Sequence, residues 1–436
     1  DILIEGGDVS LINSATLISQ RFGPGVAGDI TIKGSTVEVR NGSLIFNLNA
    51  YAGAGGNITI DANQVILDSE GNTVPGMNGI SASSNFSALF GNPALDPAFD
   101  GSAPPNLFLI YAAVLASADA GNITINATGS GGLVVLGSDI QSESRNYGKA
   151  GNININASDI VLSREGGQLG SIASQSGYAG DAGQIDINAT SNIELKDGYV
   201  ISASTSGTGT GGGVSVTAGN TISITGIKNN GQVSSGIASS TVLPTTELEE
   251  NLATLYGFPD FQTMALALYG GNPPPDANLF DVLAALKGMG LTDLGGANPV
   301  AGNAGAVSIT ASTLNMNGDH AISSSTSSDG NGGEINIQVD ALSLMNGAEI
   351  RSRSGLISEA TGLLDVGAGI GGAITITATD SSSMASGASI SSSSKSSTGD
   401  AGDITVNAGN TLDMTDSSIT TESTYADGGN IQIMAI

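Results

Sequence analysis

The sequence predicts an all-β chain folded as a right-handed parallel β-helix, a single solenoid of about twelve coils over residues 1–436. Two observations support this prediction. A glycine followed by alternating aliphatic residues recurs along the chain, and most copies of this motif lie 27 to 32 residues apart. A fixed period of this size is typical of solenoids, in which each coil buries its apolar face only against its neighbours.

The motif predicts the first strand of each coil. It reads Ala or Gly, Gly, any residue, Ile or Val, any residue, and a second aliphatic residue. Because side chains alternate between the two faces of a strand, the two aliphatic residues point to one buried face. We expect the glycine to serve a tight turn with positive φ. The central glycines are Gly7, Gly28, Gly56, Gly121, Gly151, Gly183, Gly212, Gly305, Gly333, Gly372, Gly402 and Gly429.

Each coil is expected to hold two more short strands. The second carries aliphatic pairs such as Ile160/Leu162 and Leu342/Leu344. The third begins with Ile and continues with small polar residues, as in 322–326. Three strands joined by glycine-rich turns predict a triangular coil, in which Ile stacks on Ile and Ser stacks on Ser.

Three insertions interrupt the repeat, at about 85–118, 242–301 and 356–368. All three follow the third strand of a coil, so we expect them at one corner, which in solenoids is often the binding face. Apolar residues at helical spacing predict helices over 245–255 and 278–289. The aromatic residues of the insertions leave two interpretations open: they pack the insertions onto the rod, or they contact a partner or the next subunit.

Composition narrows the classes of function. Forty acidic and twelve basic residues give a net charge of -28, which argues against nucleic acid and anionic membranes as partners. The chain has no cysteine, so disulfides and thiol chemistry are excluded. No apolar run reaches eighteen residues, so no transmembrane segment is expected. Both ends lie within the repeat pattern, and we interpret the chain as part of a longer, secreted precursor.

We predict no catalytic, cofactor-binding or metal-binding residue. Two stretches match the glycine fingerprint of dinucleotide sites, but a strand and not a helix is expected after each. The single histidine, His320, lies beside Asp319 in a turn and is expected at the surface. The two fingerprint matches are Gly207-x-Gly209-x-x-Gly212 and Gly367-x-Gly369-x-x-Gly372.

Acidic residues raise the alternative of a polysaccharide-cleaving β-helix, which uses clustered Asp residues on one face. Here the acids are scattered over turns, and we expect no stacked Asp-Asp pair in neighbouring coils, so the prediction is that the protein is not an enzyme. The calcium-binding nonapeptide of other β-solenoids does not occur, although weak surface binding of calcium by oxygen ligands stays open. Examples of these turn acids are Asp181, Asp329, Asp400, Asp403 and Asp427.

The repeats resemble those of filamentous-haemagglutinin-like exoproteins. The resemblance covers the chain except the three insertions, and it implies a right-handed β-helix, two-partner secretion, and adhesive or structural roles on a bacterial surface. The sequences that carry it are Ala150-Gly151-Asn152-Ile153-Asn154-Ile155-Asn156-Ala157, Gly332-Gly333-Glu334-Ile335-Asn336-Ile337 and Leu344-Met345-Asn346-Gly347-Ala348-Glu349-Ile350.

The expected function is therefore an extracellular structural and adhesive β-helix, a segment of a surface adhesin or filament. The alternative is a carbohydrate-binding or carbohydrate-cleaving β-helix. Expected partners are cell-surface glycans or proteins, or a second copy joined head-to-tail through the strand edges at 1–5 and 429–436. Flanking repeats that cover both ends are the other interpretation of those edges.

Overall fold

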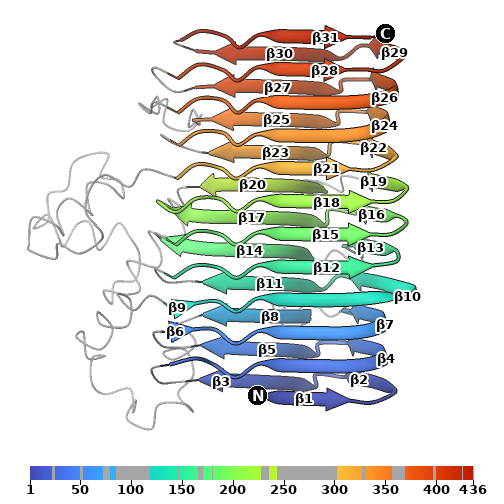
Figure 1. Ribbon diagram of the computed structural model, residues 1–436, viewed down its shortest axis with the longest axis vertical. Coiled ribbons are helices and arrows are strands. Elements are labelled where there is room, and N and C mark those ends of the chain that lie inside the picture. The colour runs from blue at the N-terminus through green and yellow to red at the C-terminus, as the bar shows by residue number, and fades with distance from the viewer. Residues whose placement is uncertain are drawn as a thin grey trace, which may run out of the picture.

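In the computed structural model, every regular element of the described residues is a β-strand (Figure 1). The strands form two long sheets and one two-stranded sheet, and all pairings are parallel. The predicted all-β class is confirmed, and the long parallel sheets are consistent with a β-solenoid. The described residues are 1–21, 25–49, 53–71, 79–84, 118–144, 148–164, 170–178, 180–226, 235–242, 302–326, 330–355, 369–395, 399–424 and 426–435.

The larger sheet, sheet A, has eighteen strands, which contain the predicted first and second strands of the repeats. They are β1 (Ile2–Glu5), β2 (Asp8–Ile12), β4 (Ile30–Arg40), β7 (Ile58–Asp68), β10 (Ile123–Leu136), β12 (Ile153–Ala157), β13 (Ile160–Ser163), β15 (Ile185–Ala189), β16 (Ile193–Lys196), β18 (Val214–Ala218), β19 (Thr221–Thr225), β21 (Val307–Thr310), β22 (Thr313–Asn317), β24 (Ile335–Met345), β26 (Ile374–Ala385), β28 (Ile404–Asn407), β29 (Thr411–Thr415) and β31 (Ile431–Met434).

The second sheet, sheet B, has eleven strands, which are the predicted third strands. They are β3 (Thr16–Arg21), β5 (Leu44–Asn49), β8 (Gly79–Ser84), β11 (Asp139–Ser144), β14 (Ser171–Tyr178), β17 (Val200–Gly207), β20 (Gly236–Val242), β23 (Ala321–Thr326), β25 (Glu349–Ser354), β27 (Ser389–Ser394) and β30 (Ser418–Ser423). The two-stranded sheet pairs β6 (Gly53–Ala54) with β9 (Ala118–Asp119).

One column of aliphatic residues runs the length of sheet A. Each member pairs with the equivalent residue of the next repeat, and the register does not slip. The column confirms that Ile stacks on Ile from repeat to repeat. Its members are Ile2, Ile30, Ile58, Ile123, Ile153, Ile185, Val214, Val307, Ile335, Ile374, Ile404 and Ile431.

The first motif copy was misassigned from sequence. Val9, which follows Gly7, pairs with Val37 in the second strand of the next repeat, whereas Ile2 pairs with Ile30 in its first strand. The prediction that Gly7 begins a first strand is therefore wrong. Alternating aliphatic residues occur in both strands, and only the short interval of 21 residues from Gly7 to Gly28 distinguishes them.

The first and second strands of a repeat form one sheet. In β4, β7, β10, β24 and β26 the two are continuous, so a single strand covers both. Irregularities in register between Ala127 and Gly132, and between Val339 and Ala341, mark the junction in two of them. Two of the three predicted strands of each repeat therefore belong to the same sheet, sheet A, and each pairs with its equivalent in the neighbouring repeats.

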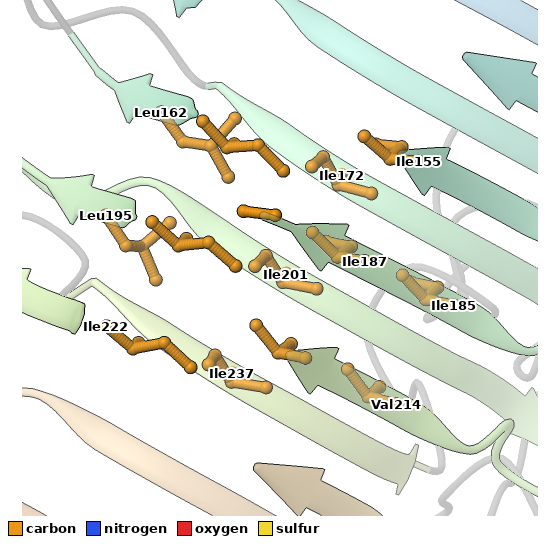
Figure 2. Packing of buried hydrophobic residues seen from close by; sticks show 14 of the residues in the cluster. Ile155, Leu162, Ile172, Ile185, Ile187, Leu195, Ile201, Val214, Ile222 and Ile237 are labelled. Carbon is orange, nitrogen blue, oxygen red and sulfur yellow. The ribbon is translucent and has the colours of Figure 1, made fainter. Parts of the chain in front are cut away.

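The core is a single apolar cluster between the two sheets. Inward residues of both sheets, such as Ile155, Ile172 and Leu195, have at most 1% of their surface exposed. Figure 2 shows these side chains stacked in rows, with Ile172, Ile201 and Ile237 from sheet B facing the residues of sheet A. Each row repeats one type of side chain, so every repeat buries its apolar face against its neighbours.

We predict that Ile155→Asp unfolds the protein or lowers its unfolding free energy by roughly 4 kcal/mol or more, because a fully buried side chain would carry an unpaired charge. Asn154→Asp adds a carboxylate at the neighbouring, outward position of β12 and is expected to be nearly silent. Urea unfolding followed by circular dichroism measures both variants. Greater loss of stability in Asn154→Asp would show that the assigned register is inverted.

Apart from Gly7, which has no atom within 4 Å of an added Cβ, the motif glycines are required by close packing of backbone and not by positive φ. No motif glycine has a positive φ, which corrects the prediction. A Cβ added to Gly151 would overlap the carbonyl oxygen of Gly121 in the preceding repeat. Positive φ occurs instead at the corner between the second and third strands, as at Gly198 (86°) and Gly347 (87°).

Two adjacent glycines offer a matched test of this close packing. A Cβ on Gly212 would overlap the carbonyl of Gly183, whereas the nearest atom to a Cβ on Gly213 is 3.7 Å away. Neither residue has a positive φ. We predict that Gly212→Ala destabilises the chain by about 1–3 kcal/mol through overpacking, and that Gly213→Ala is neutral or stabilises it by about 0.4–1 kcal/mol. Equal thermal midpoints for the two variants would contradict this.

The predicted insertions at 85–118, 242–301 and 356–368, and the helices predicted over 245–255 and 278–289, lie almost entirely outside the described residues. Only their flanks are described. The strands that precede the three segments are β8, β20 and β25, which all belong to sheet B. The three segments therefore attach at the C-terminal ends of strands of sheet B, on the same side of the stack.

Candidate functional site

Buried serines of sheet B bind the glycine corner. Ser142 donates from Oγ to the carbonyl of Gly121 (2.9 Å) and accepts from the N–H of Gly151 (2.8 Å). The predicted stacking of Ser on Ser thus has a structural purpose, because the corner carbonyl and N–H are buried and need partners. The same pair of bonds is made by Ser174, Ser324, Ser352 and Ser392.

Side chains outside the same corner form a hydrogen-bonded ladder. The residue after the motif glycine, which the sequence motif left unspecified, accepts a bond from the backbone N–H of its equivalent in the next repeat. Such bonds link Asp29 to Asn57 (2.7 Å), Asn57 to Asn122 (3.0 Å), Asn122 to Asn152 (2.8 Å) and Asn152 to Gln184 (2.8 Å). A second ladder joins the side chains of Asp61, Asn126, Asn156 and Asn188.

Two Asp-Asp pairs are stacked in neighbouring repeats, which corrects the prediction that none occurs. Asp1 accepts from the N–H of Asp29 (2.9 Å), and Asp400 accepts from the N–H of Asp427 (3.0 Å). All four residues are exposed. Each acceptor carboxylate is bonded to backbone, so these pairs stabilise turns and are not arranged as a catalytic pair.

The remaining turn acids have similar roles. Asp403 accepts from the N–H of Asn430 (2.7 Å). Asp181 accepts from Thr210 and pairs with Lys149 (3.0 Å), and the backbone bond from Thr210 is the largest cause that lowers the pKa of its carboxyl. Asp329 lies outside the described residues.

The glycine fingerprints are turns. Gly207 ends β17, and the strand β18 begins at Val214, two residues after Gly212, so a strand follows the match as predicted. In the second match Gly367 lies outside the described residues, and β26 begins at Ile374, two residues after Gly372. Neither match precedes a helix within the described residues. Also within these ranges, no three His, Cys, Asp or Glu side chains are placed to hold a metal ion, and no helix could span a membrane.

His320 is buried, which corrects the prediction of a surface residue. Its exposed fraction is 3%, and neither ring nitrogen has a hydrogen-bond partner of normal geometry. Burial lowers the pKa of the imidazole, although nearby carbonyls of Gly226, Asn317 and Ser235 act in the opposite direction. The ring is therefore neutral at physiological pH. The equivalent corner position before the third strand holds the fully buried Tyr199 in one repeat and small residues such as Ser235 in others, so His320 is the second large residue buried there.

His320 lines a hollow of about 510 Å³ on the outer side of sheet B, which we call the outer hollow. It lies over β17, β20, β23 and β25, which are successive strands of the sheet (Figure 1). Its lining mixes small apolar residues with ionic ones, and none of them, His320 and Asp319 included, was assigned to a site from the sequence. The lining residues are Val200, Ser235, Gly236, Ala238, Asp319, His320, Ala321, Ser323, Gly347, Glu349 and Arg351.

A second titratable group lies at the same corner, nearer the N-terminus. Asp139 accepts from the N–H (2.9 Å) and Oγ (3.0 Å) of Ser171. Burial outweighs these two bonds and raises the pKa of its carboxyl to about 6. Beside it, the fully buried Tyr199 donates from its hydroxyl to the carbonyl of Ser138 (3.0 Å).

Comparison of the chain with protein-family models, with curated proteins and with solved structures finds no match.

We predict that the carboxyl of Asp139 stabilises the folded protein in mild acid and that this contribution is lost at neutral pH. Its folded pKa of about 6 lies above the ordinary value of 3.8, so its contribution is fully present below pH 3.8 and is lost as pH rises through 6. The loss amounts to about 1–3 kcal/mol, allowing for partial solvation. Asp139→Asn, measured by urea unfolding from pH 4 to 7, should remove this part of the profile.

The control is Asp413→Asn, which makes the same charge change at an exposed position of β29 and should keep the wild-type profile. If the profile of Asp139→Asn ran parallel to that of the wild type between pH 4 and 7, the buried carboxyl would have no such role.

Proposed function

We propose that the chain is a right-handed parallel β-helix of twelve repeats that serves as an extracellular structural and adhesive rod, a segment of a bacterial surface adhesin or filament. The observation that supports this most strongly is the unbroken column from Ile2 to Ile431, which pairs twelve successive repeats in register. Such a stack makes an extended body whose length is set by the number of repeats. Crossovers between parallel strands are almost always right-handed, which favours that hand.

The external chemistry of the rod suits a location outside the cell. Outward positions of sheet A carry Thr, Asn, Asp and Ser, and the net charge is -28, so neighbouring rods repel one another and stay soluble. The resemblance to filamentous-haemagglutinin-like repeats gives the same role and implies two-partner secretion. The points at which three segments attach, after β8, β20 and β25, all lie at the ends of strands of sheet B, and we propose this side as the adhesive one.

The core columns are partly uncovered at the two ends of the stack, where Ile2 and Ile4 are half-buried and Ile431 (44%) and Ile433 (45%) are exposed. Unpaired strand edges at such ends pair readily with another strand. Two occupants fit them: flanking repeats, or a second copy joined head-to-tail into a filament.

The test of the proposed function is proteolysis of intact cells of the bacterium that encodes the chain. We expect an added protease to remove the chain from intact cells, and electron microscopy of the purified chain to show rods. An abundant cytoplasmic protein, followed on the same blot, controls for lysis. Cleavage that requires lysis would contradict an extracellular location, and globular particles would contradict the rod.

The second candidate is a carbohydrate-binding or carbohydrate-cleaving β-helix. The outer hollow favours the binding version, because it places ionic side chains beside small apolar ones on an accessible face.

A further inference from the structure

We propose that the outer hollow binds one or two sugar units of an uncharged glycan. The proposal deepens the adhesive role and rests on it, since it names the chemistry that such a rod would recognise. It depends on two features: the shape of the hollow and the ion pair on its wall.

The shape follows from strand register on the outer face of sheet B. One row across four strands reads Val200, Gly236, Ala321 and Glu349. The next outward row reads Ser202, Ala238, Ser323 and Arg351. Small residues of the two middle strands thus form a floor, between Val200 on one side and Glu349 with Arg351 on the other.

The walls are about 14 Å apart, because three strand spacings of about 4.8 Å separate β17 from β25. The corner residues that precede the strands, Ser235, Asp319 and His320, close one end. The hollow is therefore wide enough for one or two pyranose rings lying flat, with their C–H faces on Gly236, Ala238 and Ala321.

The ion pair on the wall supplies both kinds of hydrogen-bonding group. Arg351 donates from Nη1 to Oε2 of Glu349 (2.6 Å). A guanidinium has five N–H donors and a carboxylate has two acceptor oxygens, so one such bond leaves capacity on both groups. Adjacent sugar hydroxyls each donate and accept, and a planar pair of this kind matches two of them at once.

The charges of the lining favour an uncharged ligand. Arg351 is already paired with Glu349, and Asp319 adds a second carboxylate to the lining. An acidic sugar would approach two carboxylates on a chain of net charge -28. A neutral glycan avoids this repulsion and is therefore favoured over an acidic one.

The test is calorimetric titration of the full chain with maltotriose, cellotriose, chitotriose, xylotriose and mannotriose, and with trigalacturonic acid as the charged comparison. We expect at least one neutral trisaccharide to bind, and to bind more tightly than the acidic one. Arg351→Ala removes the donors and Ala238→Leu fills the floor, and each should weaken binding by about tenfold or more.

Matched controls lie at the next outward positions of the same strands, outside the lining. Arg353→Ala repeats the charge change on β25, and Ser240→Leu repeats the added bulk on β20. Both should bind within about twofold of the wild type, and thermal unfolding shows whether each variant is folded.

Failure of all five neutral trisaccharides to bind, preference for the acidic one, or unchanged affinity in both Arg351→Ala and Ala238→Leu would overturn the proposal. The titration uses the purified chain and is independent of where the protein is located. If protease does not remove the chain from intact cells, the extracellular role is refuted and the binding result still holds. If no trisaccharide binds in the titration, only the glycan site is refuted.

Discussion

The structure depends on the close approach of backbone to backbone at the glycine corner. There the carbonyl oxygen of one repeat occupies the space that a Cβ of the next would fill, as between Gly121 and Gly151. Backbone this close excludes water, so its polar groups need partners from the chain itself. The serines of sheet B provide them, as Ser142 does for both glycines. Close backbone packing at the corner thus requires both a glycine there and a serine hydroxyl opposite it.

In-register stacking also means that every column of side chains repeats one kind of chemistry. For apolar columns this is favourable, since Ile on Ile fills the core evenly. For acidic residues it would bring like charges together, as at Asp400 and Asp427. The carboxylate of Asp400 instead binds the N–H of Asp427, so the backbone donor offsets part of the repulsion. The chain tolerates acids in its turns because the ladder gives each acceptor a donor.

Sequence predicted the parallel all-β class because the glycine motif imposes its period on the core. The sequence-based prediction was wrong where two different structural requirements produce the same sequence pattern. Glycine is demanded both by positive φ and by close approach, and only coordinates show that Gly212 belongs to the second case. Alternation fits both strands of sheet A, so Gly7 was placed in the wrong one. The candidate site could not be predicted from sequence, because its floor and walls come from four repeats.

A repeat differs from its neighbours at the positions where the residue type in a stacked column changes. A large residue in a column needs a small one beside it, and a Cβ on Gly170 would indeed meet the ring of Tyr199. The same exchange of large for small occurs on the outer face, where Gly236 and Ala321 lie between Val200 and Glu349. The regular positions offer a ligand the same surface many times over. A ligand that recognises one place on such a stack must contact the irregular ones, and in the outer hollow irregular positions from four neighbouring strands meet.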